Sequence, residues 1–200
     1  MTTLLLLSGS PRCESYNTRL LKYLAQYLDG RCIVDMIDPA QVDLPLFNQD
    51  LEVDPSVIER VTMLHQRFEA SQGMIVASPE YNGQPTPFLK NIIDWVSRLS
   101  YIDNSFDNPF LNRPTLLCSA STGWSGGAVA IPYARALFGY VGCLVIGETI
   151  CIPNAHQAWS EDGYQFDPFF DAYIYDVTDR ALHLAHAFAL NRNSQHEVVT

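Results

Sequence analysis

The chain has 200 residues, of which 48% are hydrophobic and 17% charged, and its formal net charge is −10. This composition suits one well-buried domain and disfavours disorder over most of the chain. Nucleic acid and anionic membranes are poor partners for it, because phosphate groups attract clustered Lys and Arg. No apolar run approaches the roughly 20 residues of a membrane-spanning helix.

The cellular compartment is suggested by the first residues and by the cysteines. Residues 1–3 carry no basic side chain, so the start does not resemble a signal peptide. The five cysteines are odd in number and form no CxxC pair, which fits reduced thiols. We expect a cytoplasmic protein whose cysteines are small buried hydrophobes and whose histidines and cysteines hold no metal.

Apolar runs of strand length alternate with helical spacings along the chain. The pattern predicts five strands, at 3–7, 32–37, 73–77, 115–119 and, as a broken strand, 143–146 with 149–152. Between them it predicts a helix capped by Asn17 and ended by Gly30, a helix at 55–71 after an irregular connection at 39–54, a helix from a Thr86 cap to 99, and a helix at 128–138. A closing helix is predicted at 171–190.

This alternation predicts an α/β fold with right-handed crossovers. Five strands in a chain of this size favour a flavodoxin-like three-layer sandwich: a parallel sheet of order 2-1-3-4-5 with helices on both faces. We expect one domain over residues 1–190 and a polar tail over 191–200. Polar turns follow the first, third and fourth strands, which are neighbours in this order, so the turns should converge at one edge.

The first turn, SGSPRCESYN at 8–17, has neither a dinucleotide-binding fingerprint nor a Walker loop. Its small residues, the hydroxyls of Ser10 and Ser15, the amide of Asn17 and a helix N-terminus suit a phosphomonoester, to which Arg12 adds charged donors. The alternative is an ordinary strand-to-helix turn with an exposed arginine.

The second turn, PEYNG at 79–83, combines backbone amides, an aromatic face and an amide side chain. A flat heteroaromatic ring needs such a surface. The alternative is a surface tyrosine beside a tight turn at Asn82 and Gly83, with Glu80 accepting backbone hydrogen bonds.

The third turn, SASTGWSGG at 119–127, contains G-x-S-x-G, the nucleophile elbow of α/β-hydrolases. Acidic residues and histidines follow it, so a serine hydrolase using Ser125 is one reading. The sequence has no HGGG-like segment to form the oxyanion hole of such a hydrolase, and a hydrolase would give no role to Arg12 or to PEYNG. The other reading is a Gly-rich loop that closes over the edge of a bound ring, with Trp124 as a lid or a partner contact.

At these residues the chain resembles the NADPH-dependent FMN reductase family of flavodoxin-like quinone, chromate and azo-dye reductases. The shared motifs are GSPR-x₂-S-x-N at 9–17, SPEYNG-x-P-x₂-LKN-x-IDW at 78–95 and S-x₃-G-x₂-GG at 119–127. The resemblance covers most of the chain. Tyr16, where relatives often have Phe, and Trp124 are small departures.

The resemblance implies FMN as cofactor and NAD(P)H as co-substrate. Hydride would pass from the nicotinamide to FMN and on to a quinone, a free flavin or a similar small-molecule acceptor. The implied cofactor-binding residues are Ser10, Arg12, Ser15, Tyr16 and Asn17 for the phosphate end, Pro79, Glu80, Tyr81, Asn82 and Gly83 for the ring, and Ser119, Ser121 and Gly123 for closure.

No catalytic side chain is singled out, and the family implies a homodimer or homotetramer. A one-electron carrier like flavodoxin is the main alternative, with the serine hydrolase behind it. The sequence does not identify the acceptor or decide between NADH and NADPH.

Overall fold

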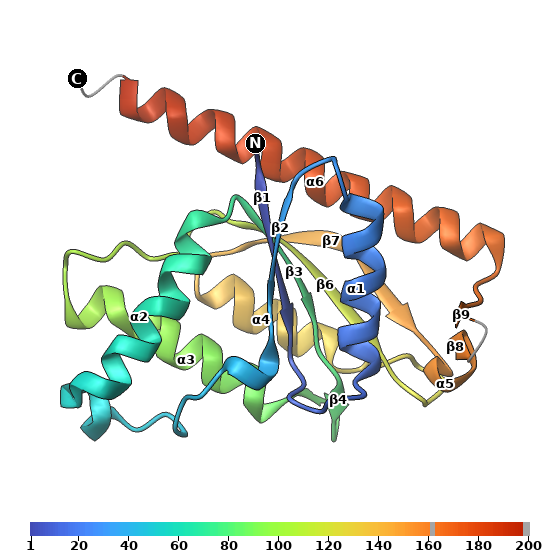
Figure 1. Ribbon diagram of the computed structural model, residues 1–200, viewed down its shortest axis with the longest axis horizontal. Coiled ribbons are helices and arrows are strands. Elements are labelled where there is room, and N and C mark those ends of the chain that lie inside the picture. The colour runs from blue at the N-terminus through green and yellow to red at the C-terminus, as the bar shows by residue number, and fades with distance from the viewer. Residues whose placement is uncertain (161–162, 198–200) are drawn as a thin grey trace.

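The computed structural model describes residues 1–160 and 163–197 (Figure 1). Its main sheet has five parallel strands in the order β2-β1-β3-β6-β7. The strands are β1 (Thr3–Ser8), β2 (Ile33–Ile37), β3 (Gly73–Ala77), β6 (Pro114–Ala120) and β7 (Leu144–Ile152). Because β6 and β7 are the fourth and fifth strands of this sheet, the predicted order 2-1-3-4-5 is confirmed.

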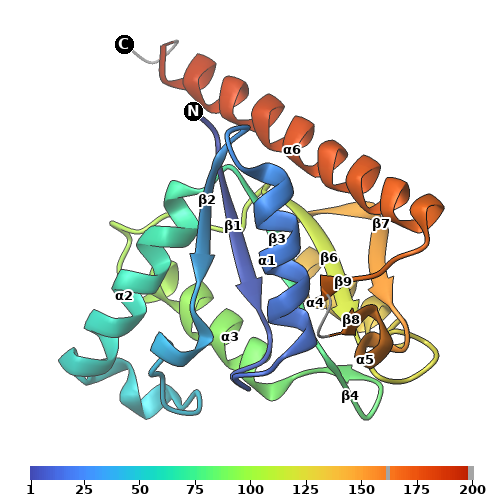
Figure 2. The same ribbon diagram turned by 45° about the vertical axis from the view of Figure 1, so that its right-hand side comes forward.

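Helices cover both faces of the sheet, so the predicted three-layer sandwich is confirmed (Figures 1 and 2). On β1, Leu4 and Leu6 pack against one helix layer and Leu5 and Leu7 against the other, and none is exposed. A strand buried on both faces is apolar throughout rather than alternating. The first layer is α1 (Tyr16–Leu28) and α6 (Pro168–Glu197), and the second is α2 (Pro55–Ala70), α3 (Pro87–Ile102) and α4 (Ile131–Tyr140).

The start of α3 is as predicted, and the start of α1 is not. Thr86 Oγ1 accepts a hydrogen bond from the Leu89 amide at 3.1 Å, and Pro87 occupies the first turn of α3. The predicted cap of α1, Asn17, is wrong: Ser15 has the extended backbone of an N-cap, and its hydroxyl accepts from the Thr18 amide. Asn17 lies inside the first turn, and its side chain reaches β6 instead.

Several predicted boundaries differ from the structure, most of them by one to three residues. The last strand is continuous, because the irregularity read as a break is a register shift between Thr115 and Leu117 of its neighbour. Helix α4 begins at Ile131 rather than 128, because residues 128–130 form turns with hydrogen bonds to the carbonyl three residues back. Helix α6 is assigned from Pro168 to Glu197, which exceeds the predicted 171–190. The division into a domain and a tail stays a prediction.

Short elements decorate the connections. They are η1 (Pro39–Gln41), η2 (Gln49–Val53), the hairpin β4 (Glu80–Tyr81) with β5 (Gln84–Pro85), α5 (Ala155–Ala158), and the hairpin β8 (Trp159–Ser160) with β9 (Gly163–Tyr164). None of these has the length or periodicity that a sequence pattern needs. Across the described residues, every helix is too short or too polar to cross a bilayer.

The five cysteines are free thiols that differ in burial. Cys13 is exposed, whereas burial raises the pKa of Cys143 to about 11 and also raises that of Cys118. Because the thiolate is the nucleophile, these two should be inert in the folded state. We expect iodoacetamide to modify Cys13 first, and a Cys13→Ser variant to lose the fast phase, as followed by intact-mass spectrometry. Equally fast labelling of Cys118 or Cys143 in native protein would contradict this.

Candidate active site

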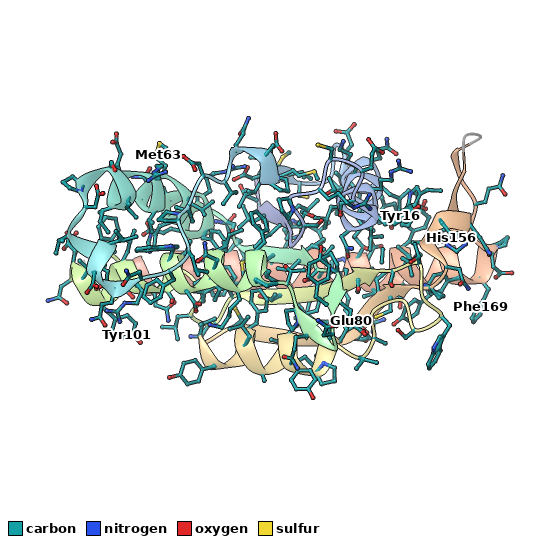
Figure 3. All side chains as sticks on the ribbon, turned by 90° about the horizontal axis from the view of Figure 1, so that it is seen from below. Tyr16, Met63, Glu80, Tyr101, His156 and Phe169 are labelled. Atoms are coloured by element: carbon teal, nitrogen blue, oxygen red, sulfur yellow. The ribbon has the colours of Figure 1, made fainter. Side chains whose placement is uncertain are left out.

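Three loops meet at the carboxyl edge of the sheet, as predicted: residues 9–15 (the first loop), 78–86 (the second loop) and 121–130 (the third loop). Figure 3 shows Tyr16 on the α1 side of this edge and Glu80 on the other side. A cavity of about 230 Å³ opens between the loops and is lined by Ser10, Arg12, Ser15, Tyr16, Asn17, Pro79, Glu80, Tyr81, Ala120, Ser121 and Thr122.

The first loop presents an anion-binding arrangement. Ser10 and Ser15 are buried in it, and α1 begins directly afterwards at Tyr16. The first-turn N–H groups of a helix lack intrahelical partners, and the dipole makes them attractive to an anion. The loop therefore offers hydroxyls and backbone donors on one side of the cavity.

Arg12 is the cation left available at this end. Arg19 is hydrogen-bonded to Glu14, and this bond, with the charge of Arg19, holds the pKa of Glu14 below its usual value. Arg12 is exposed and forms no ion pair within the described residues. Although the chain carries a net charge of −10, the unpaired guanidinium of Arg12 creates a local positive potential in the cavity wall that attracts a small anion.

Asn17 joins the first and third loops. Its Nδ2 donates to the Ala120 carbonyl and its Oδ1 accepts from the Ala120 amide, both at 2.9 Å. The side chain is 2% exposed. The side-chain amide of Asn17 therefore bonds the end of β6 and holds the cavity wall in place.

The second loop is a β-hairpin. Glu80 pairs with Pro85 and Tyr81 with Gln84, and the turn residues Asn82 and Gly83 have φ of 53° and 76°. Positive φ at both positions is the requirement of a type I′ turn, which Asn-Gly meets. The turn at Asn82 and Gly83 is therefore tight, and it leaves Tyr81 half-exposed at the rim of the cavity, where a planar ligand could still contact it.

A buried oxygen of Glu80 marks the same wall. Its Oε2 has no hydrogen-bond partner within the described chain, although buried polar groups are normally paired. Such an acceptor suits a ligand that brings a hydroxyl or an imide N–H.

Two glycines fix the third loop. Gly126 and Gly127 have φ of 63° and 86°, and a Cβ added at Gly127 would lie 1.9 Å from Ser119 Oγ. The backbone therefore folds closely over Ser119, which is 1% exposed and whose hydroxyl is likewise without a partner in the described chain. Only glycine allows this approach.

Replacing Gly127 by alanine should therefore destabilise the protein by about 2–4 kcal/mol, from strain and overpacking together. The melting temperature should fall by about 4–16 °C. Gly123→Ala is the matched control in the same loop, because its Cβ would meet nothing closer than Ser121 Oγ at 3.5 Å and its φ is not positive. Equal melting temperatures for the two variants, measured by calorimetry, would refute the role given to Gly127.

The hydrolase reading of the third loop does not match the geometry. Ser125 follows the end of β6 by five residues, and α4 starts only at Ile131, so the sharp strand-to-helix turn of a nucleophile elbow is missing. The Ser125 hydroxyl accepts a hydrogen bond from the Gly127 amide at 3.3 Å. Ser125 therefore shapes the loop. Trp124, predicted as a lid or contact, is 87% exposed.

Of the predicted binding residues, those that line the cavity are Ser10, Arg12, Ser15, Tyr16, Asn17, Pro79, Glu80, Tyr81 and Ser121. Those that lie outside its wall are Asn82, Gly83, Ser119 and Gly123. Their roles toward a ligand stay predictions. One link between the loops left no sign in the sequence. The hydroxyl of Thr86 donates to the Gly9 carbonyl and so joins the first two loops, a contact between residues far apart in the sequence.

Metal chemistry receives no support from the side chains. Within residues 1–160 and 163–197, no group of three or more His, Cys, Asp or Glu side chains is placed to hold an ion.

Comparison with known proteins places the chain among characterised relatives. The family model described as NADPH-dependent FMN reductase matches residues 2–157. A quinone reductase of Escherichia coli K12 is 28% identical over 142 residues, covering 71% of this chain and 72% of the relative. A probable NADPH:quinone oxidoreductase 2 of Oryza sativa subsp. japonica is 31% identical over 166 residues, covering 81% of this chain and 78% of the relative.

Among solved structures, the flavoenzyme NAD(P)H:(acceptor) oxidoreductase FerB of Paracoccus denitrificans is similar. It superposes with a TM-score of 0.79 at 26% identity, over 94% of this chain and 99% of the other.

Proposed function

Because the chain belongs to the NADPH-dependent FMN reductase family, we propose that the three loops bind FMN with its phosphate at the first loop and its ring across the second. The protein is an FMN-dependent NAD(P)H oxidoreductase of the quinone reductase type. This placement of FMN rests on the cavity, whose wall includes the unpaired Arg12 and the start of α1 on one side and the hairpin with the exposed Tyr81 on the other.

The donor set fits the two ends of FMN. Arg12, the buried serines and the first-turn amides of α1 suit the phosphate. The Glu80 oxygen without a partner suits a flavin hydroxyl or ring N–H. The cavity volume, about 230 Å³, is below the usual range of roughly 300–1,000 Å³ for whole-ligand pockets, and we accordingly extend the ring over the adjoining hairpin.

FMN, when bound, would supply the chemistry of hydride transfer between the nicotinamide and a quinone or flavin acceptor. The chain's part is to hold and orient. The hairpin turn keeps Tyr81 at the rim, and Asn17 and Thr86 lock the first loop to the other two. No side chain is needed as nucleophile, since backbone and hydroxyl dipoles near the ring can stabilise developing charge.

The function is tested by anaerobic spectroscopy of the FMN-loaded protein. Stoichiometric NADPH should bleach the flavin band, and a benzoquinone should restore it, without accumulation of a radical. Repeating the titration with NADH ranks the two donors. A persistent radical that fails to turn over with the quinone would instead identify a one-electron carrier.

We also propose a homo-oligomer in a reducing compartment such as the cytoplasm, which suits the five free thiols. The apolar stripe of α3 is buried within the chain, so the exposed aromatics Tyr133 and Tyr140 on α4 and Phe169 on α6 are better candidate contacts. Light scattering of the purified protein measures the state, and a monomer at working concentration would refute it.

A further inference from the structure

A continuous series of aromatic rings leads away from the cavity. Tyr16, which lines the cavity, stacks on Trp159 with ring centroids 5.9 Å apart and planes at 27°. Trp159 meets Phe166 at 5.9 Å, and Phe166 meets Tyr23 at 6.3 Å. All four rings are half-buried against the core beneath α6. Phe166 therefore bridges Trp159 and Tyr23.

The series ends in a stack of three tyrosines where α6 passes one end of α1 (Figures 1 and 2). Tyr175 of α6 lies between two residues of α1, with ring centroids 5.8 Å from Tyr23 and 4.1 Å from Tyr27. Both pairs are close to parallel, at 22° and 21°. Packing alone does not require tyrosine at these three positions, because phenylalanine would fill the same space without a hydroxyl.

Each outer phenol of the stack has a carboxylate partner. The Tyr23 hydroxyl donates to Asp171 and is also hydrogen-bonded to Tyr175, and the Tyr27 hydroxyl donates to Asp179 at 2.8 Å. Asp171 is thus placed to take the phenol proton when Tyr23 is oxidised.

Charge favours Tyr23 over Tyr16 as the place for an oxidising equivalent. The guanidinium groups of Arg12 and Arg19 lie 5.7 and 5.6 Å from the Tyr16 ring centroid, whereas the Tyr23 hydroxyl donates to Asp171. The far side of the stack is mixed, because Arg31 lies 4.6 Å from the Tyr27 ring centroid and pairs with Asp179. A positive charge on an aromatic ring is disfavoured beside cations and favoured beside carboxylates. An oxidising equivalent placed on Tyr16 or Trp159 is therefore driven toward Tyr23 and Asp171.

We propose that these rings form a path that removes single oxidising equivalents from the flavin end of the sheet and deposits them on the tyrosine stack. The oxidant would be FMN, once bound and excited by blue light, with its ring on the hairpin side of the cavity and Tyr16 on the opposite side. One electron would pass to it across the cavity from the Tyr16–Trp159 pair, and Tyr23 would then give one electron to the oxidised Trp159 while its phenol proton moves to Asp171.

The products of this sequence are a flavin reduced by one electron, a restored Trp159, a neutral Tyr23 radical and a protonated Asp171. Return of the electron and the proton restores the starting state. The first step rests on the proposed FMN position, whereas the transfer from Trp159 to the stack does not. The two parts can therefore fail separately.

The transfer is tested on flavin-free protein with azidyl radicals, one-electron oxidants of tryptophan, generated by pulse radiolysis. The chain has three tryptophans. Trp95 is fully buried and Trp124 is 87% exposed, so a Trp124→Phe background directs oxidation to Trp159. In this background the tryptophan radical absorbance should decay in step with growth of tyrosyl absorbance, independently of protein concentration.

Tyr23→Phe in the same background should abolish that coupled growth, and Asp171→Asn should slow it, because the amide accepts the hydrogen bond but not the proton. Tyr140→Phe is the matched control, since Tyr140 is 92% exposed on α4, on the other face of the sheet, and should change nothing. Unchanged kinetics in Tyr23→Phe would overturn the path and leave the cluster as packing.

Transient absorption of the FMN-loaded protein after a blue flash then tests the first step. The parent should show a tyrosyl signal that Tyr23→Phe loses. Absence of the tyrosyl signal from the parent would overturn that step.

Discussion

Replacing Arg12 by alanine should weaken FMN binding about 10- to 150-fold, which is what losing about 1.5–3 kcal/mol of charge-assisted hydrogen bonding costs. Riboflavin, which has the same ring and lacks the phosphate, should lose no more than about twofold in affinity. The reason is that Arg12 is the unpaired cation of the first loop and lies at the helix-start end of the cavity. Flavin-fluorescence titration of the flavin-free variants measures both constants.

Two further variants sharpen this result. Arg12→Lys keeps the charge but loses the planar fork, so its FMN affinity should fall between those of the parent and the alanine variant. Arg180→Ala removes an exposed arginine that pairs with Glu148 and Asp176 on the far part of the chain, and should leave both ligands unaffected. If Arg12→Ala weakens FMN and riboflavin equally, the arginine contacts something other than the phosphate.

The second large effect is expected at Asn17. Asn17→Ala leaves the buried amide and carbonyl of Ala120 without partners, at a cost of about 2–4 kcal/mol. The melting temperature should then fall by about 4–16 °C. The first and third loops also lose their connection, so FMN must order them on binding, and its affinity should fall about 5- to 30-fold. Calorimetry and flavin titration measure the two losses.

Asn91 provides the control for this variant. Its side chain likewise spans two backbone groups, accepting from the Phe47 amide at 2.7 Å and donating to the Pro45 carbonyl at 2.9 Å, but it does not line the cavity. Asn91→Ala should therefore lower the melting temperature without changing FMN affinity. A loss of FMN affinity as large as that of Asn17→Ala would show that the effect is general destabilisation.

Much of the fold follows from local pattern. The strands β1 and β3 are uninterrupted apolar runs, and α3 has both a Thr86 cap and a full apolar stripe, so periodicity and capping identified them. The sheet order was predicted from five strands alternating with helices in a chain of this size. Element ends were less predictable. The late start of α4 depends on the turns at residues 128–130, which the residue pattern does not reveal.

The site was predictable at the level of loops and less so at the level of side chains. Small residues, hydroxyls and one arginine before a helix pointed to residues that line one cavity wall, and their role toward a phosphate stays a prediction. The commitment of Asn17 to Ala120 could not be foreseen, because it joins residues 103 positions apart. The aromatic series on α6 has the same origin: Tyr175 meets Tyr23 and Tyr27 only once the last helix packs beside the first.

The most direct test of the central claim is calorimetric titration of the flavin-stripped protein with FMN. The three-loop site predicts uptake of one FMN per chain, with inorganic phosphate competing and with binding strongly reduced in Arg12→Ala. If the stripped protein, shown by circular dichroism to be folded, takes up no FMN, the loops do not form a flavin site.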